Sequence, residues 1–588
     1  MWPFSSGYPT RTPESVASQT FDYIVVGGGT AGCVLASKLS EDPNVSVLLL
    51  ERGPVVDTWA SKVPLLSVDY RPPTAPKYGW LAAPLAAAVG TPPLEMISGK
   101  LLGGTSKINA FVYARSVPGE YNAWAEAGRT GWSWEEVEPY FKGMENVLSY
   151  KNPHRGDKGP WKLRKIDTVF FENTPAVIKA TSALDIPFLD EANDPSAPST
   201  FCNRADLALN EKGQRQSTFD AFLPPEVAWK RQKNLFVVPQ VVVSKLDLQP
   251  SANGTRAVGV YFQRDSITGG SSATQFYVSA RHEIVLCSGA IASPQVLMLS
   301  GVGPAEHLRE HNIPVVKDLP GVGSELQDHV GIPLIYRIPP DDSLYKLERS
   351  PLFGLKEMLK YIFFGRGIFL FPNPQLFVFA QSQYLDQDFK TVLPDASASN
   401  AHLASNVPDI EIMHIPYCAW EFRKLKDDEG AMSFFCVLLK PHSRGTVRLT
   451  SVDPCSRPAC DLNFLSDARD WPTLRKAVRL GLALGRKVEE GGYPLGNMLQ
   501  PEDESDAGID AFVRKSVRTT YHYSSTCRMA PEAEGGVVDD ELRVHGIEGL
   551  RIADASIFPT IPATHLQAPA AMVAARCADF LKNARFSK

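Results

Sequence analysis

Three glycines near the N-terminus have the spacing of a phosphate-binding turn. Gly27, Gly29 and Gly32 follow the hydrophobic run FDYIVV, and the apolar residues of TAGCVLASKLS recur after them at helical spacing, beginning at Thr30 and Ala31. A glycine turn between a strand and a helix lets the backbone approach a pyrophosphate, and the helix N-terminus offers unpaired N–H groups. Such a turn also occurs without a ligand, so the pattern alone is a weak indication.

An acidic residue further along strengthens that indication. Glu51 ends a second apolar run, VLLL, and is followed by Arg52. An acid about 20 residues after the glycines can accept hydrogen bonds from ribose hydroxyls. We count Arg52 as part of the same site, and the combination predicts an adenine dinucleotide as the ligand.

A second glycine loop, residues 98–116, has the sequence SGKLLGGTSKINAFVYARS. Its glycine pair, next to Thr105, Ser106 and Asn109, can wrap backbone N–H groups around an extended ligand. The alternative is a surface loop that binds nothing.

Two further stretches are rich in turn signals. Residues 287–304 predict a strand that ends at a glycine and a helix that opens at Ser293 and Pro294, which are preferred residues for the N-cap and the first helical position. Residues 319–331, LPGVGSELQDHVG, predict another turn segment.

The composition bounds the class of protein. The chain has 588 residues, of which 44% are hydrophobic and 21% charged, and a formal net charge of −5. It has no basic run or aromatic stripe, so we expect no nucleic-acid partner.

The N-terminus has no basic and apolar leader, and no run approaches the roughly 20 apolar residues of a membrane span. We expect a cytoplasmic protein without a membrane span, or a secreted one if the sequence is a processed form.

Nine cysteines, an odd number without tight spacing, fit reduced thiols better than a disulfide framework. A bond between Cys455 and Cys460 remains an alternative. We expect no metal site, and the cofactor should therefore be organic.

Several stretches, in this order along the chain, resemble the glucose-methanol-choline oxidoreductases. They are those quoted above together with WAEAGRTGWSWEEVEPYFKGMEN at 124–146, HSRGTVRL at 442–449, and the C-terminal YHYSSTCRM and RIADASIFPTIPATHLQAPAAM. The likeness runs from about residue 21 to residue 581. It implies an α/β flavoenzyme with a doubly wound, Rossmann-like FAD-binding domain and a second α+β domain built on an antiparallel sheet.

The resemblance also implies the domain organisation. The FAD-binding domain would take residues 20–330 together with 515–582, interrupted around 150–230 by segments of the other domain. Residues 331–514 would form the substrate-binding domain, and residues 1–19 an N-terminal extension.

Carried over position by position, the resemblance assigns the cofactor contacts. The turn from Gly27 to Gly32 would hold the pyrophosphate, Glu51 the adenosine ribose, and the backbone of Val243 the adenine. Asp554 and Ala555 would contact the ribityl chain. Further contacts to the flavin and its diphosphate would come from Gly104, Thr105, Asn109, Ala110, Phe111, Val112, Tyr521, His565, Leu566 and Gln567.

Two positions depart from the family pattern. Members that tether FAD covalently carry a His just before the asparagine of the second glycine loop, and Ile108 stands there in this chain. We therefore expect non-covalent, dissociable FAD. Ser116 stands where the family usually has Gly, which affects the expected geometry of that turn.

Oxidation of an alcohol at a flavin requires a base for the hydroxyl proton, and neutral imidazole suits that task near pH 7. The candidates are His522 in TYHYSS and His565 in ATHLQ. The resemblance places His522 as the catalytic base and His565 as its partner, whereas without that context a histidine beside aromatics is more often a packing residue. We assign a structural or solvent-facing role to His282, His307, His311, His329, His414 and His442, and a structural role alone to His545.

The substrate is less well defined by the sequence. Residues 350–379 are rich in Phe, Leu and Ile, and in the family the corresponding region helps to line the substrate cavity. Such a wall would favour an apolar primary alcohol, aromatic or allylic, over a sugar, but these residues could equally be core. Tyr78, Trp80 and the Ala- and Pro-rich residues 81–93 form a candidate entrance loop.

The sequence therefore predicts an FAD-dependent alcohol oxidase or dehydrogenase, most like the aryl-alcohol oxidases, with oxygen or a quinone as electron acceptor. The alternatives are a hydroxynitrile lyase, in which FAD is structural, a photoenzyme of the fatty acid photodecarboxylase type, and a noncatalytic FAD-binding protein. The pair of candidate histidines favours the redox enzyme.

Overall fold

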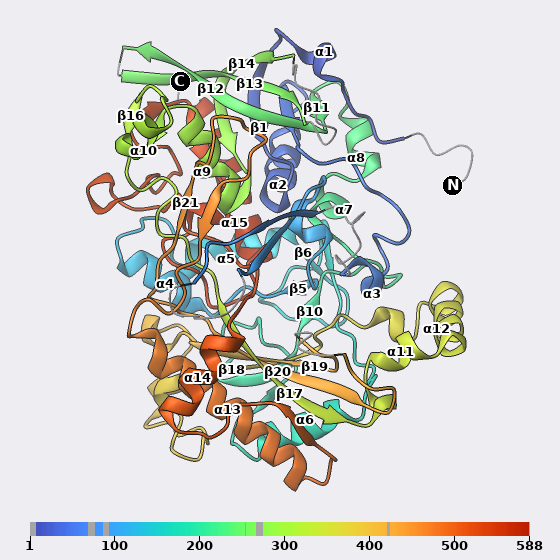
Figure 1. Cartoon of the computed structure of the whole chain (residues 1–588). Helices are drawn as coiled ribbons and strands as arrows, with labels where there is room; N and C mark the ends of the chain where they lie inside the picture. The colour runs from blue at the N-terminus through green and yellow to red at the C-terminus, as the bar shows by residue number, and fades with distance from the viewer. Residues whose placement is uncertain are drawn as a thin grey trace.

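The computed structural model describes residues 7–68, 77–85, 93–252, 254–265, 274–419 and 424–586. Two eight-stranded sheets organise the molecule, the first in the upper half of Figure 1 and the second in the lower half. Blue and red segments lie side by side in the upper half, so this half is built from both ends of the chain.

The first sheet has the strand order β11-β2-β1-β14-β13-β12. Its parallel strands are β11 (Leu235–Val238), β2 (Val47–Leu50), β1 (Thr20–Val26) and β14 (Phe276–Leu286). β2 is buried throughout and β1 is exposed only at Thr20, as expected of parallel strands covered on both faces. β13 (Gly254–Arg264) and β12 (Val241–Ser251) continue from β14 as an antiparallel ribbon.

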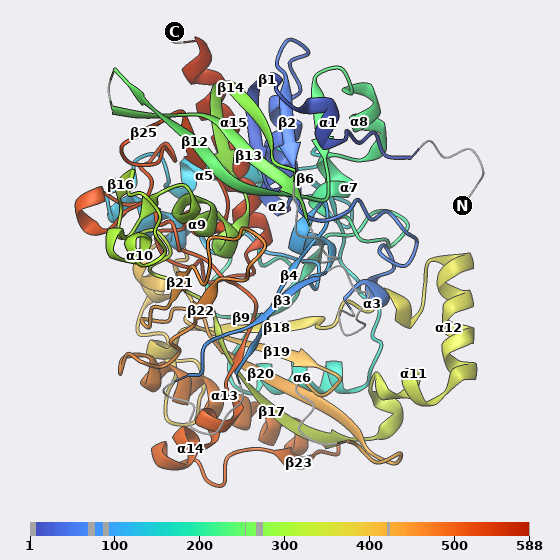
Figure 2. The same ribbon diagram turned by 45° about the horizontal axis from the view of Figure 1, so that its top comes forward.

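Elements from the C-terminus complete this half. α15 (Gln567–Phe586) packs against α2 (Thr30–Leu39), which follows β1. β26 (Leu550–Ile552) pairs in parallel with β14. Figure 2 shows the red α15 beside the blue N-terminal strands.

Helix α9 (Gly289–Leu299) begins ahead of the start predicted from the sequence. Ser293, the predicted N-cap, lies inside the helix, and its Oγ bonds to the N–H of Ser288 at 3.1 Å and to Asp554 at 2.7 Å. The predicted start was wrong because contacts with the C-terminal segment cap this helix in place of a local residue.

Pro294 consequently lies within α9. A proline has no N–H to donate to the carbonyl four residues before it, which here is Ala290. The hydroxyl of Thr526 donates to that carbonyl instead, at 2.6 Å. A bond between distant segments thus replaces a bond within the helix.

The second sheet has the strand order β23-β17-β20-β19-β18-β9-β8. Its longer antiparallel strands are β17 (Val330–Ile338), β20 (Gly430–Leu438), β19 (Ile410–Ile415) and β18 (Leu376–Ala380). Side chains alternate between its two faces. Met413 and Phe435 are paired across strands on the face toward the cavity described below. Cys436 packs on the other face against α13 (Asp470–Glu490), which approaches closely because Gly481 has no side chain.

Strand pairing shows which segments share the second sheet. β9 (Phe201–Arg204) pairs with β18, so part of the interruption predicted around 150–230 belongs here. β24 (Arg518–Thr519) pairs with β17, beyond the predicted boundary at residue 514. The domain boundaries themselves stay a prediction.

The structure describes all nine cysteines as free thiols. Cys460 accepts a hydrogen bond from the indole of Trp80 at 3.0 Å, and burial raises its pKa to about 12. Within the described ranges, we find no helix whose length and apolar character would let it cross a membrane.

Candidate active site

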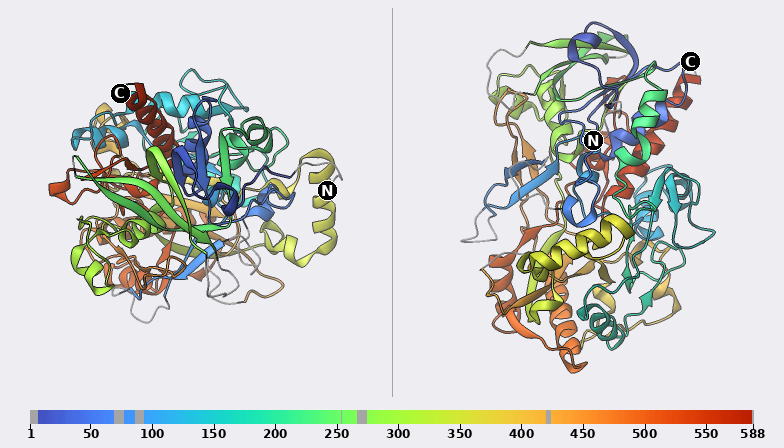
Figure 3. Two further views of the ribbon diagram at one scale, coloured as in Figure 1. Left: turned by 90° about the horizontal axis from the view of Figure 1, so that it is seen from above. Right: turned by 90° about the vertical axis from the view of Figure 1, so that its right-hand side faces the viewer.

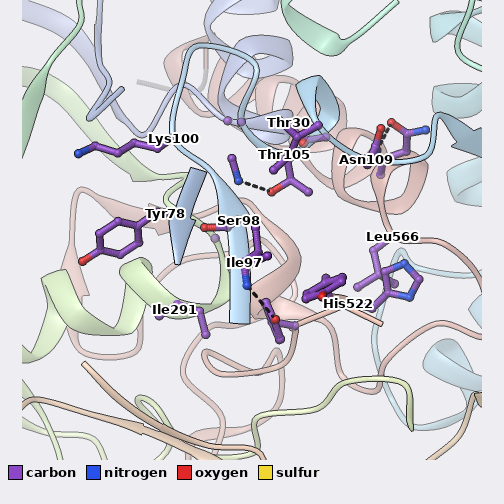
Figure 4. Close-up of a pocket in the computed structure, with 18 of the residues that line it drawn as sticks. Thr30, Tyr78, Ile97, Ser98, Lys100, Thr105, Asn109, Ile291, His522 and Leu566 are labelled. Atoms are coloured by element: carbon purple, nitrogen blue, oxygen red, sulfur yellow. Dashed lines mark hydrogen bonds between the residues drawn. The ribbon is translucent and has the colours of Figure 1, made fainter. Parts of the chain in front are cut away.

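A cavity of about 1180 Å³ is lined from both sheets. Its size exceeds the roughly 300–1,000 Å³ of a pocket for a drug-sized ligand, which leaves room for a dinucleotide and a small substrate together. Figure 4 shows part of the lining, including Thr30, Tyr78, Ile97, Ser98, Lys100, Thr105, Asn109, Ile291, His522 and Leu566.

The first glycine turn borders this cavity. Gly27 has φ +101°, and a Cβ there would lie 2.6 Å from the carbonyl oxygen of Cys287. A Cβ on Gly32 would lie 1.9 Å from the carbonyl oxygen of Gly27. At Gly29 the nearest atom to such a Cβ is 3.9 Å away. The first two glycines therefore serve the packing of the turn, and Gly29 leaves open space.

Two helix N-termini border the cavity. α2 has Gly29 as its N-cap, and Thr30 and Ala31 of its first turn line the cavity. Residues 288–292, at the start of α9, line it as well. The first N–H groups of a helix have no partner within the helix and carry partial positive charge. These donors and the open space at Gly29 fit a pyrophosphate.

Glu51 is buried at the end of β2 and lines the cavity. Its Oε2 accepts a hydrogen bond from the Gly28 N–H at 2.7 Å, and its Oε1 accepts one from the Gly53 N–H at 2.6 Å. Burial raises the pKa of this carboxyl to about 7. Each carboxylate oxygen can accept more than one bond, so Glu51 holds two backbone turns and still has lone pairs for a ribose.

Two neighbouring predicted residues also line the cavity, Val243 of β12 and Arg52. Val243 is buried. The guanidinium of Arg52 donates from Nε to Asp265 at 3.0 Å and lies 4.5 Å from the ring centre of Tyr78. Arg52 is therefore already anchored by the chain itself.

The second glycine loop packs directly on the first turn. Gly104 has φ +52°, and a Cβ there would lie 2.7 Å from the Cα of Gly29. Thr105 Oγ1 accepts a hydrogen bond from the Gly99 N–H at 3.1 Å. The loop residues that line the cavity include Gly104, Thr105, Ile108, Asn109, Ala110 and Val112.

Arg215 holds this loop, although it was not among the predicted site residues. Its guanidinium donates to Asn109 Oδ1 at 2.8 Å and to the Asn109 carbonyl at 2.6 Å, and lies 3.8 Å from the ring centre of Phe111. Complete burial lowers its pKa to about 9. Asn109 in turn donates to Gln567 Oε1 at 3.0 Å. No local motif marks Arg215, since it is 106 positions from Asn109.

Not every predicted cofactor residue lines the cavity. Gly32 faces the carbonyl of Gly27, and Phe111, with φ +64°, is fully buried beneath Arg215. Both support the site through packing and backbone shape.

The predicted C-terminal residues do line it: Tyr521, Asp554, Ala555, His565, Leu566 and Gln567. The carboxylate of Asp554 is largely occupied by the chain. Its Oδ2 accepts from the Gly289 N–H at 2.8 Å and from the Ser293 hydroxyl at 2.7 Å, while its Oδ1 accepts from the Ser556 N–H at 2.8 Å. Asp554 thus caps α9 at the edge of the cavity.

His522 and His565 both line the cavity, with ring centres 5.0 Å apart. A third histidine contacts the first, because His329 Nδ1 lies 2.9 Å from His522 Nδ1. From the sequence, His329 was expected to have a structural or solvent-facing role. The two residues are 193 positions apart, so spacing could not show this contact.

The hydrogen bonds define which ring nitrogens carry protons. His329 Nε2 lies 3.1 Å from the carbonyl oxygen of Pro562, which can only accept, so Nε2 donates. A neutral His329 then has a lone pair on Nδ1, which accepts the Nδ1–H of His522. Nε2 of a neutral His522 is therefore unprotonated and able to accept a proton.

Burial favours the neutral form of the His522 and His329 rings. Burial, assisted by the nearby His565 and His329, lowers the pKa of His522 well below its ordinary value. Burial, assisted by His565 and Lys440, likewise lowers the pKa of His329. This neutral state is the one that general-base chemistry requires.

Two buried carboxyls position the two cavity histidines. Asp328 Oδ1 accepts the backbone N–H of His522 at 2.8 Å, and its Oδ2 accepts the hydroxyl of Thr519. Burial raises the pKa of Asp328 to about 7. Glu411 on β19 accepts from His565 Nε2 at 2.9 Å. Neither carboxyl was predicted as part of the site.

The segment 350–379 is neither a cavity wall nor simply core. Asn373 and Pro374 are its members that line the cavity. The rest divides among α12 (Pro351–Phe364), whose outer face is exposed, the buried turn Ile368–Leu370 and β18. Both alternatives drawn from its composition are therefore corrected.

The cavity is nevertheless apolar on much of its surface. The side chains responsible come from several other elements: Trp80, Leu94, Ile97, Ile291, Leu344, Leu347, Met413, Ile415 and Phe435. Tyr78 and Trp80 line it too, but they lie on strand β3 (Lys77–Leu81) and not in a loop as predicted. Residues 86–92 of the predicted entrance loop lie outside the described residues.

One pair of histidines, His307 and His311 in HLREH, has the helical spacing of metal ligands. The prediction of no metal site did not take this pair into account. Their ring centres are 4.8 Å apart, and His307 Nε2 accepts the Leu449 N–H at 3.0 Å. Among the described residues, no group of three or more His, Cys, Asp or Glu could hold a metal ion.

One cavity is lined by a dinucleotide turn, by a second loop packed on that turn and by a neutral proton acceptor. These features together define a flavin-dependent oxidoreductase of the Rossmann-like class. The family models agree. The chain belongs to the GMC oxidoreductase family, whose N-terminal model matches residues 21–331 and whose C-terminal model matches residues 441–574.

Individual relatives extend over nearly the whole chain. It is 33% identical to Dehydrogenase str4 of Strobilurus tenacellus over 97% of this chain and 95% of that protein. It is 32% identical to the oxygen-dependent choline dehydrogenase 1 of Chromohalobacter salexigens, over 96% of this chain and 95% of that protein. The chain is therefore an FAD-dependent enzyme of alcohol oxidation.

Solved structures share the fold. A variant of the Aspergillus oryzae RIB40 formate oxidase, studied for FAD modification, aligns with a TM-score of 0.83 and 25% identity over 97% of this chain and 99% of that one. A fungal aryl-alcohol oxidase aligns with a TM-score of 0.81 and 22% identity, over 96% of this chain and 99% of that one. At that identity the second likeness concerns the fold alone.

Proposed function

We propose that this protein oxidises an apolar primary alcohol, aromatic or allylic, to the aldehyde, with His522 as the base. The observation that carries the proposal is the 2.9 Å contact between His522 Nδ1 and His329 Nδ1, which leaves Nε2 of a neutral His522 free to accept a proton in a cavity with an apolar wall. Aromatic side chains such as Trp80 and Phe435 favour a benzylic or allylic group over a sugar, which would need a dense set of hydrogen-bonding partners.

FAD would be held by the residues that fit a dinucleotide. The pyrophosphate would lie at Gly29 and the start of α2, the ribose at Glu51, and the remainder along Thr105 to Val112 and Leu566. When bound, FAD supplies the acceptor for the hydride that leaves the alcohol carbon.

The chain's own residues handle the proton. His522 Nε2 takes the hydroxyl proton of the alcohol, and the bond from its Nδ1–H to His329 stabilises the imidazolium that results. His565, whose Nε2 is bound by Glu411, has its Nδ1 left to orient the substrate oxygen. The apolar wall limits the access of water to the reacting atoms.

Ile108 lines the cavity and has no nucleophile with which to bond a flavin. We therefore expect acid precipitation of the yellow protein to release FAD into the supernatant. Flavin that stays with the pellet would contradict non-covalent binding.

The substrate class is tested by comparing benzyl alcohol, an allylic alcohol, choline and glucose, each with oxygen and with a quinone as acceptor. We expect benzyl alcohol to have the highest kcat/KM, because each buried apolar group contributes about 1–3 kcal/mol of discrimination. Equal kcat/KM for glucose and benzyl alcohol would contradict the proposal. If no alcohol bleaches the flavin anaerobically, the protein is a lyase or a noncatalytic FAD-binding protein instead. Turnover of a fatty acid under blue light alone would indicate the photoenzyme.

A further inference from the structure

Helix α12 (Pro351–Phe364) exposes an apolar surface that the oxidation of alcohols does not explain. Its exposed large side chains are Leu352 (81% exposed), Leu355 (57%), Leu359 (43%), Ile362 (52%), Phe363 (71%) and Phe364 (73%). Single exposed apolar residues are ordinary on protein surfaces, but a contiguous group marks an interaction site.

The exposed residues form one face. Positions 352, 355, 359, 362 and 363 follow helical spacing, so their side chains share one side of the helix. The opposite side contains the buried Glu357 and Tyr361. Figures 1 and 2 show α12 at the outer edge of the molecule beside α11 (Tyr345–Arg349), and the view from above in Figure 3 shows the same yellow helix projecting from the body.

The charge around this face is positive. Residues 351–366 contain three cationic side chains, Lys356, Lys360 and Arg366, and one acid, Glu357. Glu357 is turned inward, where it accepts the Ile368 N–H at 3.0 Å and pairs with Lys360. The whole chain has a net charge of −5, so this helix is a local exception.

The inner side of α12 is continuous with the wall of the cavity. Phe353, Met358 and Tyr361 belong to one apolar cluster with Leu344 and Leu347. Leu344 and Leu347 also line the cavity, as do Leu65 and Leu66 from the same cluster. The inner side of α12 and the cavity thus share one apolar cluster.

We propose that the exposed face of α12 docks on an anionic phospholipid bilayer, with the helix lying in the plane of the interface. Apolar residues on one face flanked by Lys and Arg are the features of an interfacial helix, and each cation near an anionic surface adds to binding.

A second copy of the chain fits this face less well. The helix has 14 residues, so it is about 21 Å long and presents an area on the order of 200 Å², whereas a standard interface buries about 800 Å² per partner. A symmetric contact would also bring the like charges of two copies together. The bilayer satisfies both the apolar face and the cations.

The test is flotation of the FAD-loaded protein with vesicles of phosphatidylcholine, alone or mixed with phosphatidylglycerol. We expect binding to the mixed vesicles that weakens with added salt. Leu359→Glu/Phe363→Glu should reduce it about a hundredfold or more, since two apolar side chains can no longer be buried. Lys356→Gln/Arg366→Gln should reduce it about tenfold, and only on the anionic vesicles.

The matched control is Leu403→Glu/Val452→Glu, which adds the same charges at exposed apolar positions on other loops. Its binding should equal that of the wild type, and all variants should keep their FAD content and Tm. Absence of wild-type binding to the mixed vesicles, or equal loss of binding in the control, would overturn the proposal. A dimer in light scattering that only Leu359→Glu/Phe363→Glu dissociates would make a second copy the occupant instead.

Discussion

The two ends of the cavity are built in different ways. The dinucleotide end is local, since Gly27, Gly29 and Glu51 fall within one β-α-β segment of the first sheet. The histidine end is assembled from distant segments that contribute His329, Glu411, His522 and His565. Backbone shape forms the dinucleotide end, whereas hydrogen bonds between side chains form the histidine end. A substitution at one end should therefore affect binding, and a substitution at the other should affect chemistry.

The largest expected effect is at the histidine end. We expect His522→Ala to lower the rate of flavin reduction by roughly 10²–10⁴-fold, the range for loss of a positioned base, while FAD remains bound. Anaerobic stopped flow with a benzylic alcohol measures the rate, and the visible spectrum measures occupancy. His442→Ala, at an exposed histidine, is the control. Wild-type rates in His522→Ala would remove this residue from the mechanism.

At the dinucleotide end, we expect Glu51→Ala to weaken FAD binding by about 1.5–3 kcal/mol, the value of hydrogen bonds to a charged group. Reduction of the FAD that remains bound should keep its wild-type rate. Glu41→Ala, at an exposed acid that pairs with Lys582, controls for loss of charge. If Glu51→Ala slows reduction without releasing FAD, the separation between the two ends fails.

The buried Glu51 also gives a pH dependence. Because burial raises its pKa to about 7, the carboxylate becomes protonated as the pH falls through 7 and accepts hydrogen bonds less well. FAD binding in the wild type should therefore weaken toward acid pH, and Glu51→Gln should lose that dependence. Equilibrium dialysis between pH 6 and 8 measures the affinity for FAD. If the affinity depends on pH equally in the wild type and in Glu51→Gln, Glu51 is not the group that titrates.

A smaller effect is expected at His329. His329→Leu removes the acceptor of the His522 Nδ1–H and should slow flavin reduction about tenfold, which corresponds to one hydrogen bond of about 0.5–1.5 kcal/mol. His329→Asn can offer a carbonyl oxygen in its place and should recover part of the rate. Equal rates in both variants would show that His329 acts by packing alone.

The smallest effect concerns the pH profile of the wild type. Because the pKa of His522 is lowered well below its ordinary value, the base stays neutral at neutral pH. The rate of flavin reduction should therefore be level above about pH 6.5, the unperturbed value for histidine, and fall only at more acid pH. A rate that still rises steeply above that pH would indicate a different base.

The ends also differ in how far the sequence could predict them. The fold class and the family are confirmed. Gly27, Gly29, Gly104 and Glu51 line the cavity, and their contacts with FAD stay a prediction. His329, Glu411 and Arg215 were missed because each acts through a partner more than a hundred positions away. The segment 350–379 was misread because composition does not tell an exposed apolar helix from a buried one.

Pro294 has a consequence for the order in which the protein is made. The carbonyl of Ala290 accepts its hydrogen bond from Thr526, which lies 236 positions further along the chain. Asp554 caps the same helix, and β26 pairs with β14. During synthesis the dinucleotide-binding half therefore remains unfinished until residues 526–554 have left the ribosome. A chain that ends early would expose buried polar groups and an open sheet edge, which are features that cellular quality control can recognise.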